Sequence, residues 1–432
     1  FYHLFYQYNP ESSLEPGIAH WGHAKSNNLV NWEHLPISMY PNKWYDMSGV
    51  FSGSAIVEDD KMYIFYTGNV NHPGEDPDHK QYQALAVSTD GVNVEKYENN
   101  PIINGSDHQP NIRDPKVWKH ADTYYMVLGN SYNNNTLGRA LLYSSKDMMS
   151  WNEVAILDKS DGPLGFMWEC PDFFKLGLKH VLLFSPQGVE PQGDKYKNLY
   201  QTGYITGLFD YKTHNFRPST EFVELDHGHD FYATQTILDK SNRRIVIAWF
   251  DMWEQNYPER ADGFTGHMTI PRVLHILPSG KIIQQPISEI VLARGRELYS
   301  GRAQPKDAVI LEDKAGEVRV SAPPTVNLEL FIESDDDADT VKISYDTKEG
   351  KITLDRGGND GVRRTDWRPI ADLKWRIFID ASSIELFCGE GEVTFSSRFF
   401  PKGNIKVRFG EQSQPYKVII NAMKRTVPDM TV

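Results

Sequence analysis

Five short aliphatic and aromatic segments recur along the first 250 residues at a nearly constant interval. Their first residues are Phe1, Lys61, Thr123, Lys179 and Arg243, so successive starts differ by 60, 62, 56 and 64 residues. The segments lack helical periodicity and are bounded by Gly, Asn, Asp and Pro, which indicates short β-strands. Five similar units of several strands each predict radial repetition, as in a five-bladed β-propeller. An irregular array of β-sandwiches is the alternative.

The sequence pattern changes near residue 295. Alternating segments, separated by turn signals, then lie at 326–332, 341–345, 351–354, 375–379, 383–387 and 418–422. This pattern is typical of an antiparallel β-sandwich. We therefore predict an all-β chain with a five-bladed β-propeller at 1–293, a linker at 294–302 and a β-sandwich at 303–432. The acidic run 335–337 is expected to be a solvated turn, because its spacing fits no calcium loop.

Charge and motif content argue against several classes of function. The chain has 45 Lys and Arg against 58 Asp and Glu, a net charge of −13, so nucleic acid and anionic membranes are poor partners. No apolar run approaches the ~18 residues of a membrane helix. Cys170 and Cys388 are too few and too far apart for a disulfide framework or a zinc site. The run His227-Gly228-His229-Asp230 has no second ligand cluster, so we expect no metal and no other cofactor.

One polar residue precedes each of the last four repeated segments at a similar distance. Ser52 and Asp114 lie 9 residues before their segments, Glu169 lies 10 before and Asp230 lies 13 before. Because the inner strands of a propeller line a common axial cavity, we expect these side chains to converge. A pair of carboxyl groups in one cavity is the arrangement that cleaves an acetal, with one acid protonating the leaving oxygen.

Carboxylates that share a cavity repel each other, so at least one of them should have a raised pKa. We expect Trp168 to disfavour the ionised form of the neighbouring Glu169, because an apolar neighbour destabilises a charge. We expect Arg113 to keep the adjacent Asp114 ionised.

The motifs resemble glycoside hydrolase family 32, the β-fructofuranosidases. The resemblance runs nearly end to end through YHLFYQYNP (2–10), WGHAKSNNLVNWEHLP (21–36), FSGSA (51–55), RDPKV (113–117), ECPDFF (169–174), DFYATQ (230–235), TIPR (269–272) and SSIELFCGEGEVTFSSRFFP (382–401). It implies that Glu169 is the general acid/base, and that Asp114 stabilises the transition state with Arg113 beside it. It also implies positions in the fructose pocket or at the rim of the funnel for Gln7, Trp21, Phe51, Ser52, Cys170, Asp230, Tyr232 and Trp249.

The sequence departs from the family pattern in one respect. The nucleophile of the family is the aspartate of a W-M-N-D-P-N-G motif upstream of the segment that here occupies 2–10, and the sequence does not contain this motif. The repeat spacing independently puts the inner strand of the first blade before Phe1. We therefore expect the first blade to be truncated in this sequence and the native N-terminus to extend upstream. A chain that truly starts at Phe1, and is then inactive as a hydrolase, is the alternative.

The resemblance implies a retaining glycoside hydrolase that releases terminal β-D-fructofuranosyl residues through a covalent fructosyl-enzyme. Its expected substrates are sucrose or related fructosides, the candidates being raffinose, inulin and levan. A fructosyltransferase of the same fold is one alternative, and a non-catalytic carbohydrate-binding propeller is another if the native chain starts at Phe1. Localisation stays open, with an extracellular site slightly favoured.

Overall fold

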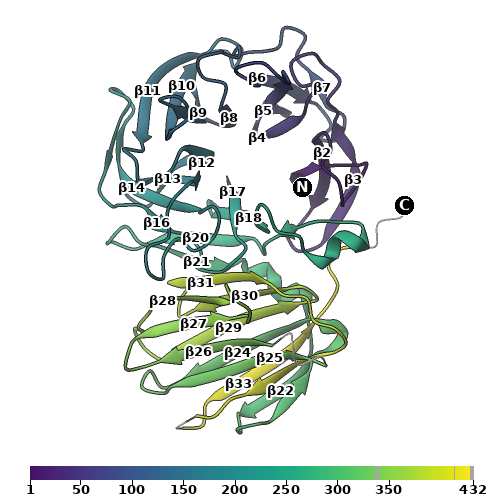
Figure 1. Cartoon of the computed structure of the whole chain (residues 1–432), viewed down its shortest axis with the longest axis vertical. Coiled ribbons are helices and arrows are strands. Elements are labelled where there is room, and N and C mark those ends of the chain that lie inside the picture. The colour runs from purple at the N-terminus through teal and green to yellow at the C-terminus, as the bar shows by residue number, and fades with distance from the viewer. Residues whose placement is uncertain (336–339, 413, 429–432) are drawn as a thin grey trace.

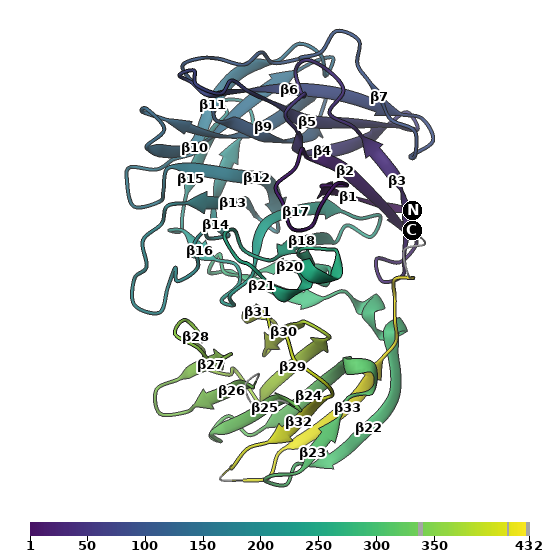
Figure 2. The same cartoon turned by 45° about the vertical axis from the view of Figure 1, so that its right-hand side comes forward.

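The computed structural model describes residues 1–335, 340–412 and 414–428. Its regular structure is almost entirely β, with three short 3-10 helices, η1 (Pro258–Asp262), η2 (Ser288–Ala293) and η3 (Glu312–Lys314), among the described residues. The all-β prediction is therefore confirmed. Two lobes follow each other along the chain, and Figures 1 and 2 show the N-terminal lobe as sheets arranged around a common centre, above a layered C-terminal lobe. Of the acidic run 335–337, residues 336 and 337 lie outside the described residues.

The N-terminal part (residues 1–293) contains five antiparallel sheets in chain order. The first sheet has β1 (Tyr2–Tyr8), β2 (His20–Ser26) and β3 (Trp32–Met39). The second has β4 (Val50–Glu58), β5 (Lys61–Asn71), β6 (His79–Ser88) and β7 (Glu95–Lys96). The third has β8 (Ile112–His120), β9 (Thr123–Tyr132), β10 (Leu137–Ser145) and β11 (Asn152–Lys159).

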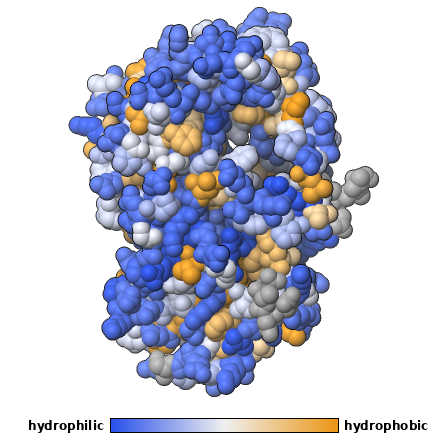
Figure 3. Space-filling model, viewed as in Figure 1, coloured by the Kyte–Doolittle hydropathy of each residue, from blue (hydrophilic) through white to orange (hydrophobic). Residues whose placement is uncertain are grey.

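The remaining two sheets of this part are built in the same way. The fourth has β12 (Met167–Leu176), β13 (Lys179–Gln187), β14 (Gly203–Asp210), β15 (Asn215–Pro218) and β16 (Val223–Glu224). The fifth has β17 (Tyr232–Leu238), β18 (Arg244–Phe250), β19 (His267–Met268), β20 (Arg272–Ile276) and β21 (Ile282–Pro286). The strands β4, β8, β12 and β17 are edge strands that face the common centre (Figure 1). The surface is hollowed over this centre (Figure 3).

The C-terminal part (residues 294–428) consists of two six-stranded sheets that enclose one apolar core. One sheet has β22 (Arg294–Arg302), β24 (Gly316–Ala322), β29 (Leu373–Asp380), β30 (Ser383–Cys388), β31 (Val393–Arg398) and β33 (Lys417–Met423). The other has β23 (Ala308–Ile310), β25 (Leu328–Ser334), β26 (Val341–Asp346), β27 (Lys351–Asp355), β28 (Val362–Asp366) and β32 (Ile405–Phe409). Alternate residues such as Leu328, Leu330 and Ile332 face the core, because successive side chains of a strand point to opposite faces.

The predicted linker at 294–302 is wrong. These residues form strand β22, which pairs along its length with β33 from the other end of the C-terminal part. The sequence does not reveal this pairing because the partner lies more than one hundred residues downstream and β22 has little apolar alternation. The C-terminal part therefore begins directly after η2.

The two parts meet along β31, the outer strand of its sheet. The segment between β16 and β17 runs beside it, with the amide of His227 donating to the carbonyl of Thr394 at 2.8 Å and the amide of Asp230 donating to that of Ser396 at 3.0 Å. Gly228 lies between these bonds, and a Cβ atom there would come within 2.1 Å of the Ser396 carbonyl oxygen. Glycine is therefore required for this close approach.

Arg272 is a fully buried cation at this junction. Its guanidinium donates to Asp226 Oδ2 at 3.0 Å in the N-terminal part and to Glu385 Oε1 at 2.8 Å in the C-terminal part. We expect Arg272→Met to lower the free energy of unfolding by ~3–5 kcal/mol, because two buried carboxylates lose their counter-charge. Denaturant unfolding measures this loss. Arg296→Gln, which removes the exposed pair with Glu312, is the control and should cost less than ~1 kcal/mol. Equal losses in the free energy of unfolding for the two variants would contradict the role of Arg272 as a buried counter-charge.

Candidate active site

The four inner strands β4, β8, β12 and β17 share a β-bulge at the same level. Two residues are left unpaired after Val50, Arg113, Glu169 and Tyr232. Bulges bend a strand, redirect its side chains and are frequent next to active sites. At three of these bulges a non-glycine residue adopts a left-handed backbone conformation, with φ of 66° at Asp114, 46° at Cys170 and 56° at Ala233. Such conformations cost free energy and concentrate at functional sites.

The bulges correct the register that the sequence spacing predicted. They align Arg113, Glu169 and Tyr232 with one another and Asp114 with Cys170, so Asp114 and Glu169 are not equivalent positions. Asp230 lies two residues before the aligned position. The spacing misplaces Asp230 because it counts through the hairpin turn, and the turn between β17 and β18 is longer than the two-residue turns of the other three hairpins. Asp114 and Glu169 precede turns of equal length, and their offsets of 9 and 10 residues already place them one residue apart.

Both oxygens of the Glu169 carboxyl group are held by side chains from neighbouring sheets. Arg113 donates Nε–H and Nη2–H to Oε1 at 3.0 and 2.9 Å. The hydroxyl of Tyr232 donates to Oε2 at 2.5 Å. Residues on β8, β12 and β17 thus meet at one point, although their bulges are more than fifty residues apart in sequence. The carboxyl group cannot rotate without losing these bonds.

Asp114 lies directly beside this cluster and is buried. Its Oδ2 accepts the amide hydrogen of Cys170 at 2.9 Å, and its own amide donates to the hydroxyl of Thr67 on β5 at 3.0 Å. Burial, followed by the charge of Glu169, raises the pKa of Asp114 to about 6. The raised pKa that we expected for a carboxyl group of the cavity therefore belongs to Asp114.

The two expectations about neighbours of the carboxyl groups have different outcomes. The charge of Arg113 lowers the pKa of Asp114, as expected, but burial and the charge of Glu169 outweigh this effect. Of the two carboxyl groups, it is Glu169 to which the Arg113 guanidinium donates. The expectation for Trp168 is wrong. Trp168 does not line the cavity, because the side chains of adjacent strand residues point to opposite faces. Its indole is buried in the core and stacks on Phe184, with ring centroids 4.1 Å apart.

Four predicted pocket residues lie where the first two sheets meet. Gln7 on β1 donates its Nε2–H to the carbonyl of Val50 at 3.0 Å, and the indole of Trp21 on β2 donates to the carbonyl of Phe51 at 3.0 Å. Phe51 and Ser52 are the two unpaired residues of the β4 bulge. These contacts bring the four residues to the same level of the inner strands as Asp114.

A row of aromatic side chains leads away from the carboxyl cluster. The ring of Tyr232 lies near those of Trp249 and Tyr200, with centroids 6.4 and 5.9 Å apart. Trp249 in turn contacts Trp253 at 5.4 Å, and about half of the Trp253 side chain is exposed. Tyr200 and Trp253 could not be predicted from the sequence, because both lie in irregular segments where no motif or spacing marks them.

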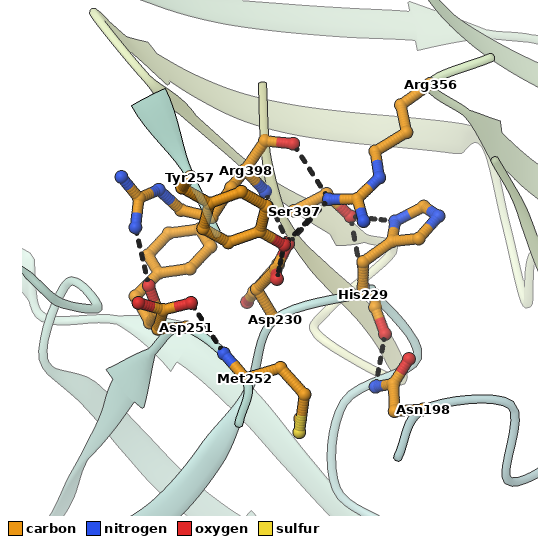
Figure 4. Close-up of polar contacts among 12 residues, drawn as sticks. Asn198, His229, Asp230, Asp251, Met252, Tyr257, Arg356, Ser397 and Arg398 are labelled. Atoms are coloured by element: carbon orange, nitrogen blue, oxygen red, sulfur yellow. Dashed lines mark hydrogen bonds and ion pairs between the residues drawn. The ribbon is translucent and has the colours of Figure 1, made fainter. Parts of the chain in front are cut away.

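Asp230 is not at the rim of the cavity, so its predicted role there is wrong. It is completely buried at the junction between the two parts, where Oδ2 accepts from Nη1 of Arg356 and from the amide of Arg398, both at 2.8 Å. The hydroxyl of Tyr257 donates to its Oδ1 (Figure 4). Asp230 precedes β17 in an irregular segment that runs along β31, so its side chain faces the C-terminal part.

The described ranges contain no candidate metal site and no candidate membrane-spanning helix. No group of three or more His, Cys, Asp and Glu side chains in these ranges is arranged to hold a metal ion. His229, from the run that we considered as a metal site, has Nδ1 at 2.7 Å from the Ser397 hydroxyl and Nε2 at 2.9 Å from the Gly361 carbonyl. No helix in the described part of the chain has the length and apolar character needed to cross a membrane.

Comparison with known families identifies the chain. The N-terminal domain of glycosyl hydrolases family 32 matches residues 1–286, and the C-terminal domain of the same family matches residues 312–420. The chain belongs to glycosyl hydrolase family 32. The family resemblance that the motifs predicted is therefore confirmed.

Relatives within family 32 cover nearly the whole chain. A sucrose-6-phosphate hydrolase of Zymomonas mobilis is 37% identical over 94% of this chain and 84% of its own length. A raffinose invertase of Escherichia coli is 34% identical over 93% of this chain and 85% of its own length. A solved family 32 β-fructofuranosidase of Bombyx mori is 42% identical, with a TM-score of 0.93 over 99% of this chain and 89% of that one. The same Bombyx enzyme has also been solved as an aspartate-to-alanine mutant in complex with sucrose.

Proposed function

We propose that this family 32 chain is a retaining β-fructofuranosidase that releases terminal fructosyl groups from sucrose or a close derivative. The observation that carries the proposal is the cluster of Glu169, Arg113, Tyr232 and Asp114 at the bulges of the inner strands. The printed names of the relatives, sucrose-6-phosphate hydrolase, raffinose invertase and β-fructofuranosidase, support a substrate of the sucrose type. We further propose that the five sheets are five propeller blades within residues 1–293.

In the proposed first step, Glu169 protonates the glycosidic oxygen as the bond to the anomeric carbon breaks. Arg113 occupies Oε1 with two N–H groups, so the transferable proton belongs on Oε2. The nucleophile in this proposal is the aspartate that the family resemblance puts upstream of Phe1. In a retaining enzyme the nucleophile and the acid lie about 5–5.5 Å apart.

In the proposed second step, Glu169 takes a proton from the water that attacks the fructosyl-enzyme. Between the two steps its carboxylate is stabilised by Arg113 and by the hydroxyl of Tyr232. The pKa of this hydroxyl is raised well above its usual range by burial, so it stays protonated and remains a donor. Asp114 accepts hydrogen bonds from fructosyl hydroxyl groups, which strengthen as positive charge develops at the sugar ring.

Product analysis tests the proposal on the protein with its native N-terminus. We expect sucrose, sucrose 6-phosphate and raffinose all to release fructose, and sucrose 6-phosphate to leave glucose 6-phosphate as the second product. The β-anomer of fructose should appear first by NMR because two displacements retain configuration. Inulin and levan in the same panel measure the tolerance for longer chains. Initial release of the α-anomer would contradict the retaining mechanism, and growth of fructose chains at high sucrose would assign a fructosyltransferase instead.

A further inference from the structure

We propose that Arg356, in the C-terminal part, is a positioning residue for the general acid/base Glu169 and acts through Asp230 and Tyr232. The inference rests on the proposed function of Glu169. It makes the C-terminal part a contributor to the geometry of the active site, although the residues that hold the Glu169 carboxyl group all come from the N-terminal part.

Arg356 contacts Asp230 directly. Arg356 follows β27, and its Nη1 donates to Asp230 Oδ2 at 2.8 Å and to the carbonyl of Arg398 at 3.0 Å. The Arg398 amide donates to the same carboxylate oxygen at 2.8 Å, and the Tyr257 hydroxyl donates to the other one. These donors converge on a carboxylate that has no exposed surface (Figure 4).

A short stretch of chain connects Asp230 to Tyr232, the residue that donates to Glu169. Only Phe231 separates Asp230 from Tyr232, and Phe231 is itself buried against the guanidinium of Arg272. On the far side, the amide of Ala233 donates to the Ser185 hydroxyl at 3.2 Å. Tyr232 is therefore fixed between an anchor in the C-terminal part and an anchor on β13. Its bond of 2.5 Å to Glu169 would be lost if the segment moved by less than an ångström.

The charged side chains around Asp230 determine what the loss of Arg356 would cost. Arg398 also donates to Glu259 at 2.8 Å, and Asp251 lies close enough for the charges of Asp230, Glu259 and Arg398 to affect it. Removing Arg356 would leave Asp230 without its guanidinium partner, because Arg398 donates to it through the backbone amide while its own guanidinium donates to Glu259. A buried carboxylate that loses its counter-charge must protonate or move towards water, and either change would release the start of β17.

A matched control distinguishes this role from a general loosening of the junction. Arg364 on β28 also joins the two parts, because its Nε donates to Asp194 of the N-terminal part at 2.8 Å. Asp194 is more than thirty residues from Asp230 in sequence, and Arg364 is about half exposed. Arg364→Gln thus removes an arginine of the junction without disturbing the start of β17.

The test is a double-mutant cycle on the protein with its native N-terminus. We expect Tyr232→Phe to lower kcat on sucrose about tenfold, the effect of losing one hydrogen bond to a charged group. Arg356→Gln should lower kcat by at least threefold, with KM changed less than twofold, and Arg356→Lys should restore part of the loss. In the Tyr232→Phe background Arg356→Gln should have no further effect, because the two changes act through the same bond. Arg364→Gln should leave kcat unchanged.

The inference is overturned if Arg356→Gln has the same kcat as the unmodified protein. It is also overturned if the fold-loss in kcat of the double mutant equals the product of the two single-mutant losses. Should Arg356→Gln fail to fold, Tyr257→Phe replaces it, since it removes one bond to Asp230 and leaves the charge in place. A kcat loss that is absent in the Tyr232→Phe background supports the inference, and an unchanged kcat overturns it. Glu169→Gln separates the two proposals: if it abolishes turnover while Arg356→Gln does not affect it, only the positioning role fails.

Discussion

Glu169→Gln is expected to lower kcat on sucrose by ~10²–10⁴-fold, the usual contribution of a positioned general acid/base. The glucose that leaves sucrose is a poor leaving group without a proton. The amide can still accept from Arg113 through its oxygen and donate to the Tyr232 hydroxyl through its nitrogen, so we expect the fold to persist. Steady-state kinetics and a melting curve measure the two effects.

A substrate with an activated leaving group separates the acid role of Glu169 from its base role. Nitrophenyl β-D-fructofuranoside needs no proton at its leaving oxygen, so Glu169→Gln should still form the fructosyl-enzyme and release a burst of nitrophenol. Azide, an anion that attacks without a general base, should then restore turnover and produce fructosyl azide. A loss of only a few-fold on sucrose, or turnover that azide does not change, would remove Glu169 from the acid/base role.

Asp114→Asn is expected to lower kcat/KM on sucrose by ~10²–10³-fold, comparable to the loss of one preorganised group that stabilises a transition state. The amide oxygen can still accept from the Cys170 amide, but it carries no charge to stabilise the developing cation. Asn111→Ala, which removes a side chain that contacts Arg113 at 3.1 Å and leaves Asp114 in place, is the comparison. A kcat/KM as high as that of the unmodified protein would remove Asp114 from the site.

The same substitution should increase stability in a pH-dependent way. The pKa of Asp114 is about 6 in the folded protein and about 3.8 in the unfolded chain, so the folded state binds its proton more tightly. The native protein therefore loses up to ~3 kcal/mol of stability as the pH rises from below 4 to above 6. Asp114→Asn avoids this loss, so the difference in melting temperature between the two proteins should grow across this range. A difference that is constant with pH would contradict the shifted pKa.

Sequence alone predicted the components of the site better than their arrangement. The repeat and the motifs identified the inner strands that carry Asp114 and Glu169, since apolar runs and turn residues are local signals. They could not identify the partner of Arg113, because a one-residue error in register exchanges the side chains that face the cavity. The bulges that set this register are defined by pairing across the hairpin and not by residue type.

The role of Asp230 could not be predicted from the sequence for a different reason. Its partner Arg356 lies 126 residues downstream, in a loop whose composition indicates only a turn. The same holds for β22, whose pairing with β33 joins the two ends of the C-terminal part. Contacts between distant segments depend on the packed fold, so no local pattern contains them.

The backbone pairing of 227–230 along β31 also affects how the molecule can be divided. A lone C-terminal part would present β31 to solvent as an open strand with unsatisfied amides and carbonyls, and such edges recruit other chains and cause aggregation. The isolated N-terminal part would in turn lose the donors from Thr394 and Ser396 to Asp226 and the donors from Arg356 and Arg398 to Asp230. Expression of either half alone should therefore yield insoluble material, whereas co-expression of the two halves should allow them to assemble.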